Sequence, residues 1–398
     1  MRKISLVTIL ASAASSIAMT STAYAADCST LPSPLYISAS GNHKALLKQA
    51  SAVLSQGATP VTIVFQSYVS CVALDQLVTN TNATSSPIYW DSTGAEVACT
   101  IPVAGVPPDV AMSDVYASTC GTTLPSTMKD FVGPIQVMAF VTSAGSSETS
   151  ISAQAAYVTL GFGGTTYPVA PWTDVNFLFI RPDTAGTKLL IANAIGLPVG
   201  KWKGQSRPTA GDVLTSISTT TNPAATLGII TTELSDAYRT AVAGKQLKTL
   251  AFQHKGQSCG YYPDSSSTSF DKRNVREGRY PLWGPFHVAT RVDGQGKPSD
   301  PEAEKFVNVI TRNGLTEAQK QSMTDAEIAA HAVPACAMKV ERTSEMSVPT
   351  KRAADEPCGC YFETKTGGAA TSCTACTDDS GCAAGANKKC RFGFCEAR

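Results

Sequence analysis

Arg181-Pro182-Asp183-Thr184-Ala185-Gly186-Thr187 is the stretch of the sequence that says most about fold and function. An apolar run from Asn176 to Ile180 precedes it and is typical of a buried strand, and apolar residues at helical spacing follow as far as Ile195. Free backbone N–H groups at the start of a helix, at the positive end of its dipole, form a site for an anion. The stretch therefore predicts a strand-to-helix turn that binds an oxyanion.

The side chains of this turn suit the same ligand. Arg181 offers a forked donor to a phosphate-like group, Gly186 lets the backbone come close, and Thr187 adds a hydroxyl. Asp183 can accept a hydrogen bond from an oxyanion that carries a proton, and it would repel one that does not. The alternative is an ordinary helix N-cap by Asp183 or Thr184, with Arg181 paired locally.

Three further strand-to-helix turns have similar chemistry. They are Ser40-Gly41-Asn42 after a strand at 35–38, Ser70 as the expected N-cap of a helix after a strand at 61–65, and Ser113-Asp114 at the end of a strand at 110–112. Turns of this kind, at the carboxyl ends of strands, form the crevice in which open α/β sheets bind ligands.

The remaining segments predict the fold class. More buried strands are expected at 134–141, 250–253 and 286–292. Strands that alternate with helices predict an α/β fold with mainly parallel sheets. Two capping boxes, Thr316 with Gln319 and Thr324 with Glu327, predict two short helices near the end of the main fold.

The order of these segments resembles the phosphate-binding proteins of ABC importers, which have the type 2 periplasmic binding fold. In that family a Ser/Thr/Gly loop, a Gly-Ser-Gly-rich turn, a Ser-Asp pair, a Pro-headed strand, a Trp-Asp segment, an R-x-D-x-S-G-T turn and a Tyr-Pro segment follow one another. The corresponding segments here span about residues 35–314 and are Ser40-Gly41-Asn42, Ser70-Cys71, Ser113-Asp114, Pro134-Ile135-Gln136-Val137, Trp172-Thr173-Asp174, Arg181 to Thr187 and Arg279-Tyr280-Pro281-Leu282.

The resemblance implies two α/β lobes that close over a small oxyanion, with phosphate as the first candidate, and a closed form that an ABC permease recognises. The first lobe is expected at 26–128 and 246–345, the latter with the terminal helices, and the second at 129–245. The expected site residues are Ser40, Gly41, Asn42, Ser70, Ser113, Asp114, Arg181, Asp183, Ala185, Gly186 and Thr187. Ala185 replaces a serine of the family and Cys71 a glycine, so the identity of the anion stays open.

The N-terminus predicts export. Basic residues precede an uncharged run from Ile4 to Met19, and Ala23-Tyr24-Ala25 supplies the small residues that a signal peptidase reads. Asp27 stands before Cys28 where a lipoprotein would need a small residue. We therefore expect a signal peptide at 1–25 and a soluble, unlipidated, monomeric mature chain in the periplasm or outside the cell.

The 13 cysteines are unevenly distributed, with seven of them between Cys358 and Cys395. In an exported chain they predict disulfides rather than zinc ligands, and the odd total leaves one unpaired or intermolecular. Cys336 is expected to pair with Cys358 or Cys360, which would tie the tail to the main fold. A linker is expected at 346–357, and a disulfide-rich module at 358–398 that is too small for a hydrophobic core of its own.

Composition and motifs disfavour several function classes. Charged residues make up 16% and the net charge is +1, so the chain lacks the basic field that a nucleic-acid partner requires. The basic run Lys272, Arg273, Arg276 and Arg279 is typical of a solvated loop. The histidines lack metal-ligand spacing, and the sequence offers no nucleophile–base pair.

We therefore expect a binding protein that is not an enzyme and that uses no metal or cofactor. The alternative is an envelope or surface protein that keeps the fold without transporting a ligand and binds a partner through its cysteine-rich tail. A phosphate-handling hydrolase is disfavoured for want of catalytic residues.

Overall fold

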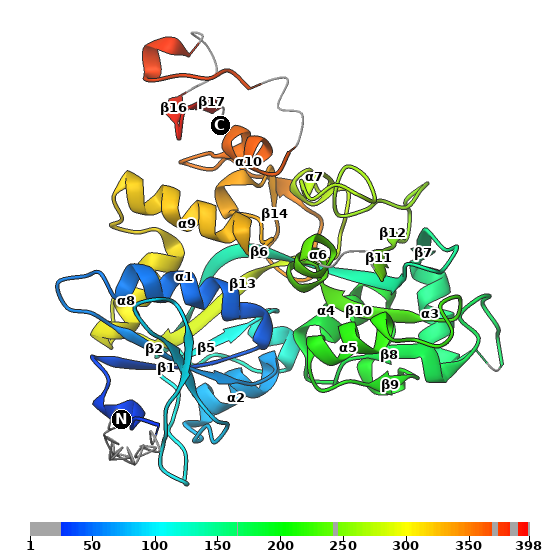
Figure 1. Cartoon of the computed structure of the whole chain (residues 1–398), viewed down its shortest axis with the longest axis horizontal. Coiled ribbons are helices and arrows are strands. Elements are labelled where there is room, and N and C mark those ends of the chain that lie inside the picture. Colours follow the sequence, from blue (N-terminus) through cyan, green and yellow to red (C-terminus); the bar gives the residue numbers. More distant parts are fainter. Residues whose placement is uncertain (1–24, 165, 242–245, 368–372, 383–388, 397–398) are drawn as a thin grey trace, which may run out of the picture.

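The computed structural model describes residues 25–164, 166–241, 246–367, 373–382 and 389–396. Its main sheet has the strand order β4-β3-β2-β1-β5-β13-β6-β10-β8-β9, with β11 paired to β6. The strands at the two ends of this order belong to two lobes, which β6 and β13 connect (Figure 1). The predicted α/β class is confirmed.

The first lobe is built on parallel pairing of β1 with both β2 and β5. Its strands are short and almost wholly buried because helices pack against them, which explains their continuous apolar runs. The elements of this lobe are β1 (Pro34–Ala39), α1 (Lys44–Leu54), β2 (Thr62–Ser67), α2 (Ser70–Thr79), β3 (Ile88–Trp90), β4 (Glu96–Ala98), β5 (Val110–Ser113), α8 (Pro301–Thr311) and α9 (Glu317–Ala329).

Two long strands run between the lobes. The first part of β6 (Met128–Ser143) pairs antiparallel with β13 (Trp283–Arg291), and its last part pairs antiparallel with β10 and β11. β13 also pairs antiparallel with β5. The sheet is therefore mixed. The predicted parallel pairing holds within β2-β1-β5 and within β10-β8-β9, whereas the centre and the β4-β3-β2 edge are antiparallel.

The second lobe packs its helices around β10 and β8, which are parallel neighbours. Its core includes Leu190, Ile191, Leu227 and Trp202, all buried. The elements are β7 (Ser150–Ser152), α3 (Ala153–Phe162), β8 (Leu178–Ile180), α4 (Gly186–Ile195), β9 (Gln205–Ser206), α5 (Ala210–Ser218), β10 (Leu227–Thr231), α6 (Thr232–Ala241), β11 (Leu247–Thr249), β12 (Ala251–Gln253) and α7 (Arg273–Arg276). The second lobe thus extends beyond the expected boundary at 245, because β11 pairs with β6, β12 pairs with β7, and Val275 of α7 packs in the same core.

One of the two predicted capping boxes is confirmed. Thr316 and Gln319 bond reciprocally at the start of α9. The box predicted at Thr324 and Glu327 is wrong, because α9 continues through both residues without a break. The Thr324 hydroxyl donates to the carbonyl of Lys320 one turn earlier, and Glu327 forms a buried ion pair with Arg312.

The cysteine-rich tail is bound to the main fold rather than separate from it. Its elements are α10 (Gly359–Lys365), β16 (Lys389–Arg391) and β17 (Phe394–Glu396), and the hairpin of β14 (Val340–Glu341) and β15 (Thr350–Lys351) precedes them. In Figure 1 α10 lies beside α7 and α9. The predicted bridge from Cys336 is formed with Cys358. Three more bridges, Cys360–Cys373, Cys376–Cys390 and Cys382–Cys395, staple the tail.

The remaining cysteines give a simple test of the covalent structure. Cys28–Cys99 and Cys71–Cys120 are bridged in the first lobe, and Cys259 is free and exposed. We expect alkylation of the unreduced, denatured protein to add one label per chain, and substitution of Cys259 by serine to remove it. Labelling of more than one cysteine in the wild-type chain would contradict the pairing.

The predicted signal peptide at 1–25 lies outside the described residues except for its last residue. Within the described part of the chain, the longest apolar helices are too short to cross a bilayer.

Candidate functional site

A cavity of about 520 Å³ lies between the lobes. The first lobe contributes Ser40, Gly41 and Asn42, together with the loop between β2 and α2. The second lobe contributes Arg181 at the end of β8, the start of α5 and the first turns of α6, and the end of α9 closes one side. Four of the eleven predicted site residues therefore line one cavity, although 141 residues separate the first from the last in sequence.

Arg181 contributes a buried positive charge to this cavity. Its side chain is only 5% exposed, and Nε has no hydrogen-bond partner among the described residues. Nη1 donates to the carbonyl of Arg207 at 3.2 Å, which fixes the plane of the guanidinium. Burial lowers the pKa of Arg181 from its ordinary value, and Asp114 opposes this effect. A buried, partly unbonded guanidinium is costly without an anion and favourable with one.

Glu233 lies on the same cavity, in the first turn of α6. It is 7% exposed, Oε1 accepts a long hydrogen bond from the backbone N–H of Val137, and Oε2 has no partner among the residues described. Burial raises the pKa of Glu233 to about 8, and the carboxylate of Asp114 adds to this effect. At neutral pH the group is therefore a carboxylic acid that can donate a hydrogen bond to a ligand oxygen.

The other ionisable groups of the cavity add little charge. Lys44 forms an ion pair with Glu96, at 2.7 Å. Burial lowers the pKa of His331, which leaves the imidazole neutral at neutral pH. The resulting cavity has one buried positive charge and one buried neutral acid, an arrangement that favours an anion over a cation.

The predicted turn at 183–187 meets the first lobe directly. The N–H of Cys71 donates to the carbonyl of Thr184 at 3.2 Å, and the N–H of Asp114 donates to the hydroxyl of Ser70. A Cβ atom placed on Gly186 would lie 2.5 Å from the Cβ of Asp114 and 2.7 Å from the Ser70 hydroxyl. Glycine is required here because the two lobes touch at this point. The sequence predicted that the backbone at Gly186 comes close to a ligand, whereas in the structure it comes close to the opposite lobe.

Asp114 is held by the first lobe. Its Oδ1 lies 3.2 Å from Nε2 of His43, and the amide of Asn42 donates to Oδ2 at 3.5 Å. Burial lowers the pKa of His43, with Asp114 opposing, so the imidazole is neutral at neutral pH. Because Asp114 also raises the pKa of Glu233, it links the lobe contact to the cavity.

Other predicted residues have local structural roles. Asp183 is exposed and is not among the residues that line the cavity, and its carboxylate is paired with Lys188 Nζ at 2.6 Å. Ser113 bonds within its own turn, to both the N–H and the carbonyl of Val115. Ala185 is the buried N-cap of α4 and makes no side-chain cap bond. Thr187 is buried in the first turn of the same helix.

The N-cap expected for α2 is wrong, and so is the alternative of an N-cap by Asp183 or Thr184 for α4. Val69, not Ser70, is the N-cap of α2, and the Ser70 hydroxyl is used to hold Asp114. Neither Asp183 nor Thr184 caps α4, which begins at Gly186 because the chain is still extended at Ala185. In both helices the side chains near the start serve the lobe contact or the surface rather than the helix end.

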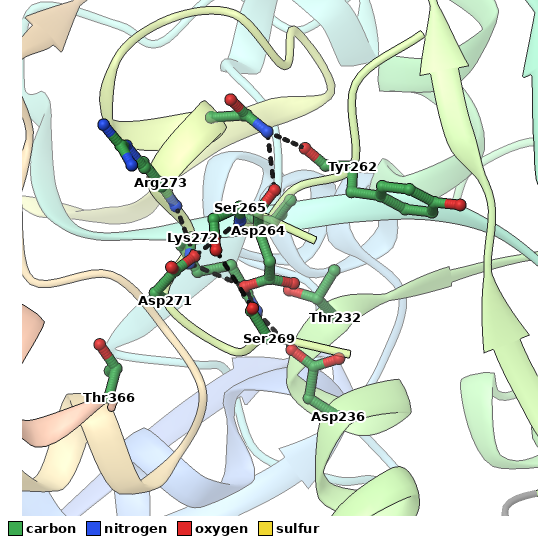
Figure 2. Close-up of polar contacts among 12 residues, drawn as sticks. Thr232, Asp236, Tyr262, Asp264, Ser265, Ser269, Asp271, Lys272, Arg273 and Thr366 are labelled. Carbon is green, nitrogen blue, oxygen red and sulfur yellow. Dashed lines mark hydrogen bonds and ion pairs between the residues drawn. The ribbon is translucent and has the colours of Figure 1, made fainter. Parts of the chain in front are cut away.

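The basic run 272–279 is not a solvated loop. Lys272 and Arg276 are each 1% exposed, while Arg273 and Arg279 are more than half exposed at their side chains. Figure 2 shows Lys272 among the carboxylates of Asp236 and Asp264. Arg239 binds the other oxygen of Asp236 at 3.1 Å.

This buried cluster supports the cavity wall. Asp236 and Arg239 lie on α6, the helix whose first turn contains Glu233. Burial lowers the pKa of Lys272, but Asp236 and Asp264 outweigh it, and the pKa lies above the ordinary value. Burial also raises the pKa of Asp264 to about 6, with Lys272 opposing. The ion pairs therefore tie α6 to the loop that precedes α7.

The sequence analysis missed Glu233 and the start of α5. Glu233 follows the buried strand Leu227–Thr231, so it occupies a fifth strand-to-helix turn of the kind that was recognised elsewhere. At α5, Thr209 and Asp212 form a reciprocal capping box. Both turns could have been found from sequence by reading 227–231 as a strand and Thr209 as an N-cap.

No family model and no curated protein matches the sequence. A similar solved structure is that of a putative phosphate ABC transporter substrate-binding protein with bound phosphate from Clostridium perfringens, with a TM-score of 0.51 and 10% identity over 76% of this chain and 99% of that chain. Others are an ABC-type phosphate transport receptor from Vibrio cholerae (TM-score 0.46, 14% identity, 76% and 100% covered) and the reduced OxyR regulatory domain from Pseudomonas aeruginosa (0.40, 9%, 71% and 99%).

The first of these likenesses establishes the fold. This chain has the two-lobed fold of the periplasmic binding proteins, extended by a disulfide-rich module at its C-terminus.

Proposed function

We propose that the protein captures a small oxyanion in the cavity between its lobes, with phosphate as the first candidate. The observation that carries the proposal is the buried guanidinium of Arg181, which lines the cavity and whose Nε atom has no hydrogen-bond partner among the described residues. Binding an anion there would compensate a charge that the folded protein already buries, and charge-assisted hydrogen bonds of this type are the strong ones. The protonated Glu233 would donate a further hydrogen bond.

The residues that line the cavity suit binding rather than turnover. Among the described side chains that line the cavity, the ionisable ones are Lys44 in its ion pair with Glu96, a neutral histidine, one arginine, one protonated acid and Tyr68, whose hydroxyl accepts hydrogen bonds from the backbone N–H groups of Thr84 and Ser85. A guanidinium and a carboxylic acid both donate to an anion, but neither attacks it.

The test is titration calorimetry of the mature protein with phosphate and sulfate, combined with native mass spectrometry of the protein as purified. We expect saturable binding of one anion per chain, and a retained mass in the native spectrum where affinity is high. Absence of binding by phosphate, sulfate and small organic acids alike would refute the proposal and favour a fold retained without a ligand.

The proposal includes a place for the protein in the cell. We propose an exported monomer whose loaded form is recognised by an ABC permease. An oxidising compartment fits the six disulfides, which join cysteines 13 to 71 positions apart in sequence. Cell fractionation tests the location, light scattering the oligomeric state, and anion-dependent stimulation of permease ATPase activity the transport role.

The pH dependence of binding tests the part assigned to Glu233. Because its pKa is raised to about 8, the group is neutral and donates below that pH, and it is a repelling carboxylate above it. Anion affinity should therefore fall as the pH rises through about 8. Sulfate is the suitable probe, since its own charge stays constant between about pH 6 and about pH 9.5.

Substitution of Glu233 by glutamine supplies the control for this profile. The amide remains a neutral donor at every pH, so we expect the variant to bind sulfate at pH 7 within a few-fold of the wild type and to lose the decline above pH 8. The other groups that face Glu233, which are Asp114, Arg181 and His331, are unchanged in the variant. A decline that persists in the variant would assign the titration to one of them.

A further inference from the structure

The cavity is much larger than an inorganic oxyanion needs. Its volume of about 520 Å³ lies within the range of about 300–1,000 Å³ that is usual for sites of organic ligands. A water molecule takes about 30 Å³ of liquid volume, and inorganic phosphate is only a few times larger. Bound alone, phosphate would leave most of the cavity to water.

The polar and apolar parts of the wall lie at different depths. The two groups that lack partners, on Arg181 and Glu233, are buried at the bottom of the cavity. Toward the solvent the wall contains small or apolar residues that are exposed or half-buried, beside the polar Ser67, Tyr68 and Thr209 and the ion-paired Lys44. The apolar ones are Ala45, Val69, Pro208, Leu234, Ala237 and Ala329. The bottom can bind an acidic group, and the outer wall offers carbon surface without a free charge.

The lobes already touch beside the cavity, so the space is not simply a gap that closure would remove. Cys71 and Thr184 are hydrogen-bonded across the lobes, and Gly186 packs against Asp114 and Ser70. Closing the remaining volume around a bare phosphate would require this contact to break or slide. A ligand with a body fills the volume without such a change.

We propose that the natural ligand is an organic anion, in which an acidic head group binds Arg181 and Glu233 and a small uncharged, largely apolar body occupies the outer cavity. The inference rests on the proposed function, since it needs the same anion site, and it adds the class of the ligand. The head could be a phosphate monoester or a carboxylate, because both present oxygen atoms to a guanidinium and a protonated acid.

Phenyl phosphate and benzoate are suitable probes, and phosphate and acetate are the matching small anions that lack the aromatic ring. Burial of a phenyl ring against the outer wall should tighten binding on the order of tenfold or more over the matching small anion. Calorimetry with the four ligands measures this ratio for each head group. The aromatic ligand that binds more tightly shows whether the acidic head group of the natural ligand is a phosphate monoester or a carboxylate.

A substitution at the outer wall separates this inference from the function on which it rests. Ala237→Trp, at an exposed position of α6, should fill the outer cavity, weaken the better aromatic ligand by tenfold or more, and leave the small anions within about twofold. Ala241→Trp lies on the same helix outside the cavity lining and should change neither.

The outcomes are distinct. Equal affinity for the small and aromatic anions, with no effect of Ala237→Trp, would overturn the inference and leave the oxyanion site in place. Failure of all four ligands would overturn both.

Discussion

Replacement of Lys272 by methionine should destabilise the folded protein by about 3–5 kcal/mol, because it removes the cation shared by two buried carboxylates and leaves Asp236 with Arg239 alone and Asp264 with no cation from this cluster. Lys272, Asp236 and Asp264 are each at most 3% exposed, and the ammonium lies between the two acids (Figure 2). Methionine keeps the length and volume of the side chain, so the loss reports on charge rather than on a cavity. Urea unfolding of the mature protein, with its disulfides intact, measures the difference.

The neighbouring arginine provides the matched control. Arg273 carries the same charge one position later, but its side chain is 59% exposed and its ion pair with Glu277 is at the surface. Pairs of this kind contribute about 0–1 kcal/mol, so Arg273→Met should unfold at nearly the wild-type urea concentration. Equal destabilisation by the two substitutions would mean that the buried cluster is not the cause.

The stability of the Lys272 variant as a function of pH gives a second, independent test of the same cluster. In the wild type Lys272 opposes the effect of burial on Asp264, whose pKa is about 6. Without the ammonium that pKa should rise further. When the pKa of a carboxyl group is higher in the folded than in the unfolded state, the folded protein loses stability as the pH rises from the unfolded-state pKa to the folded-state pKa. The deficit of the variant should therefore grow above about pH 6 and shrink in acid, and Asp264→Asn in the same chain should recover part of it.

The same cluster shows where sequence reasoning stops. Lys272 lies in a run of basic residues that has the composition of a solvated loop, and the carboxylates that bury it are 36 and 8 positions away. Arg276 is paired with Glu363, 87 positions later. Burial of a charge depends on partners brought by tertiary structure, and composition within a short window contains no information about them.

Features that depend on local sequence were predicted well. The strand-to-helix turns at Ser40 and Arg181 lie where they were expected, because apolar runs and turn residues fix them locally. At Ser113 the strand ends as expected, but only the short 3-10 helix Ala117–Cys120 follows it. The bridge from Cys336 was narrowed to two partners, one of which is correct, because few cysteines lie nearby. The role of individual side chains in these turns was predicted less well. The Ser70 hydroxyl accepts from the N–H of Asp114 instead of capping its own helix, because the end of the neighbouring strand lies beside it.

The candidate site was predicted in part for the same reason. Ser40, Gly41, Asn42 and Arg181 line the cavity, but the order of segments could not show that Gly186 would pack against the opposite lobe or that Asp183 would turn to Lys188. Glu233 was missed because a glutamate after an apolar strand is unremarkable until its burial is known. Its raised pKa is a product of the fold.

Loss of the guanidinium at position 181 should weaken anion binding by about 2–5 kcal/mol, which is roughly 30-fold to several thousand-fold in the dissociation constant. Arg181→Met removes the single buried cation of the described cavity wall, and no nearby basic side chain can replace it, because Lys44 is tied to Glu96 and Arg207 to Ser216 and the backbone. Arg181→Lys should recover the charge but only part of the affinity, since an ammonium lacks the forked geometry.

The stability of the unliganded variant distinguishes a binding residue from a structural one. Arg181 is buried with Nε unbonded, so its replacement by methionine should leave the melting temperature of the unliganded protein unchanged or raise it. Arg207→Met, in the next loop and outside the cavity lining, serves as the control for affinity. Calorimetry and thermal unfolding with and without anion would check both expectations. An unchanged dissociation constant would move the anion site elsewhere, whereas a strongly destabilised unliganded variant would make Arg181 part of the scaffold and deprive the cavity of the group on which its proposed function depends.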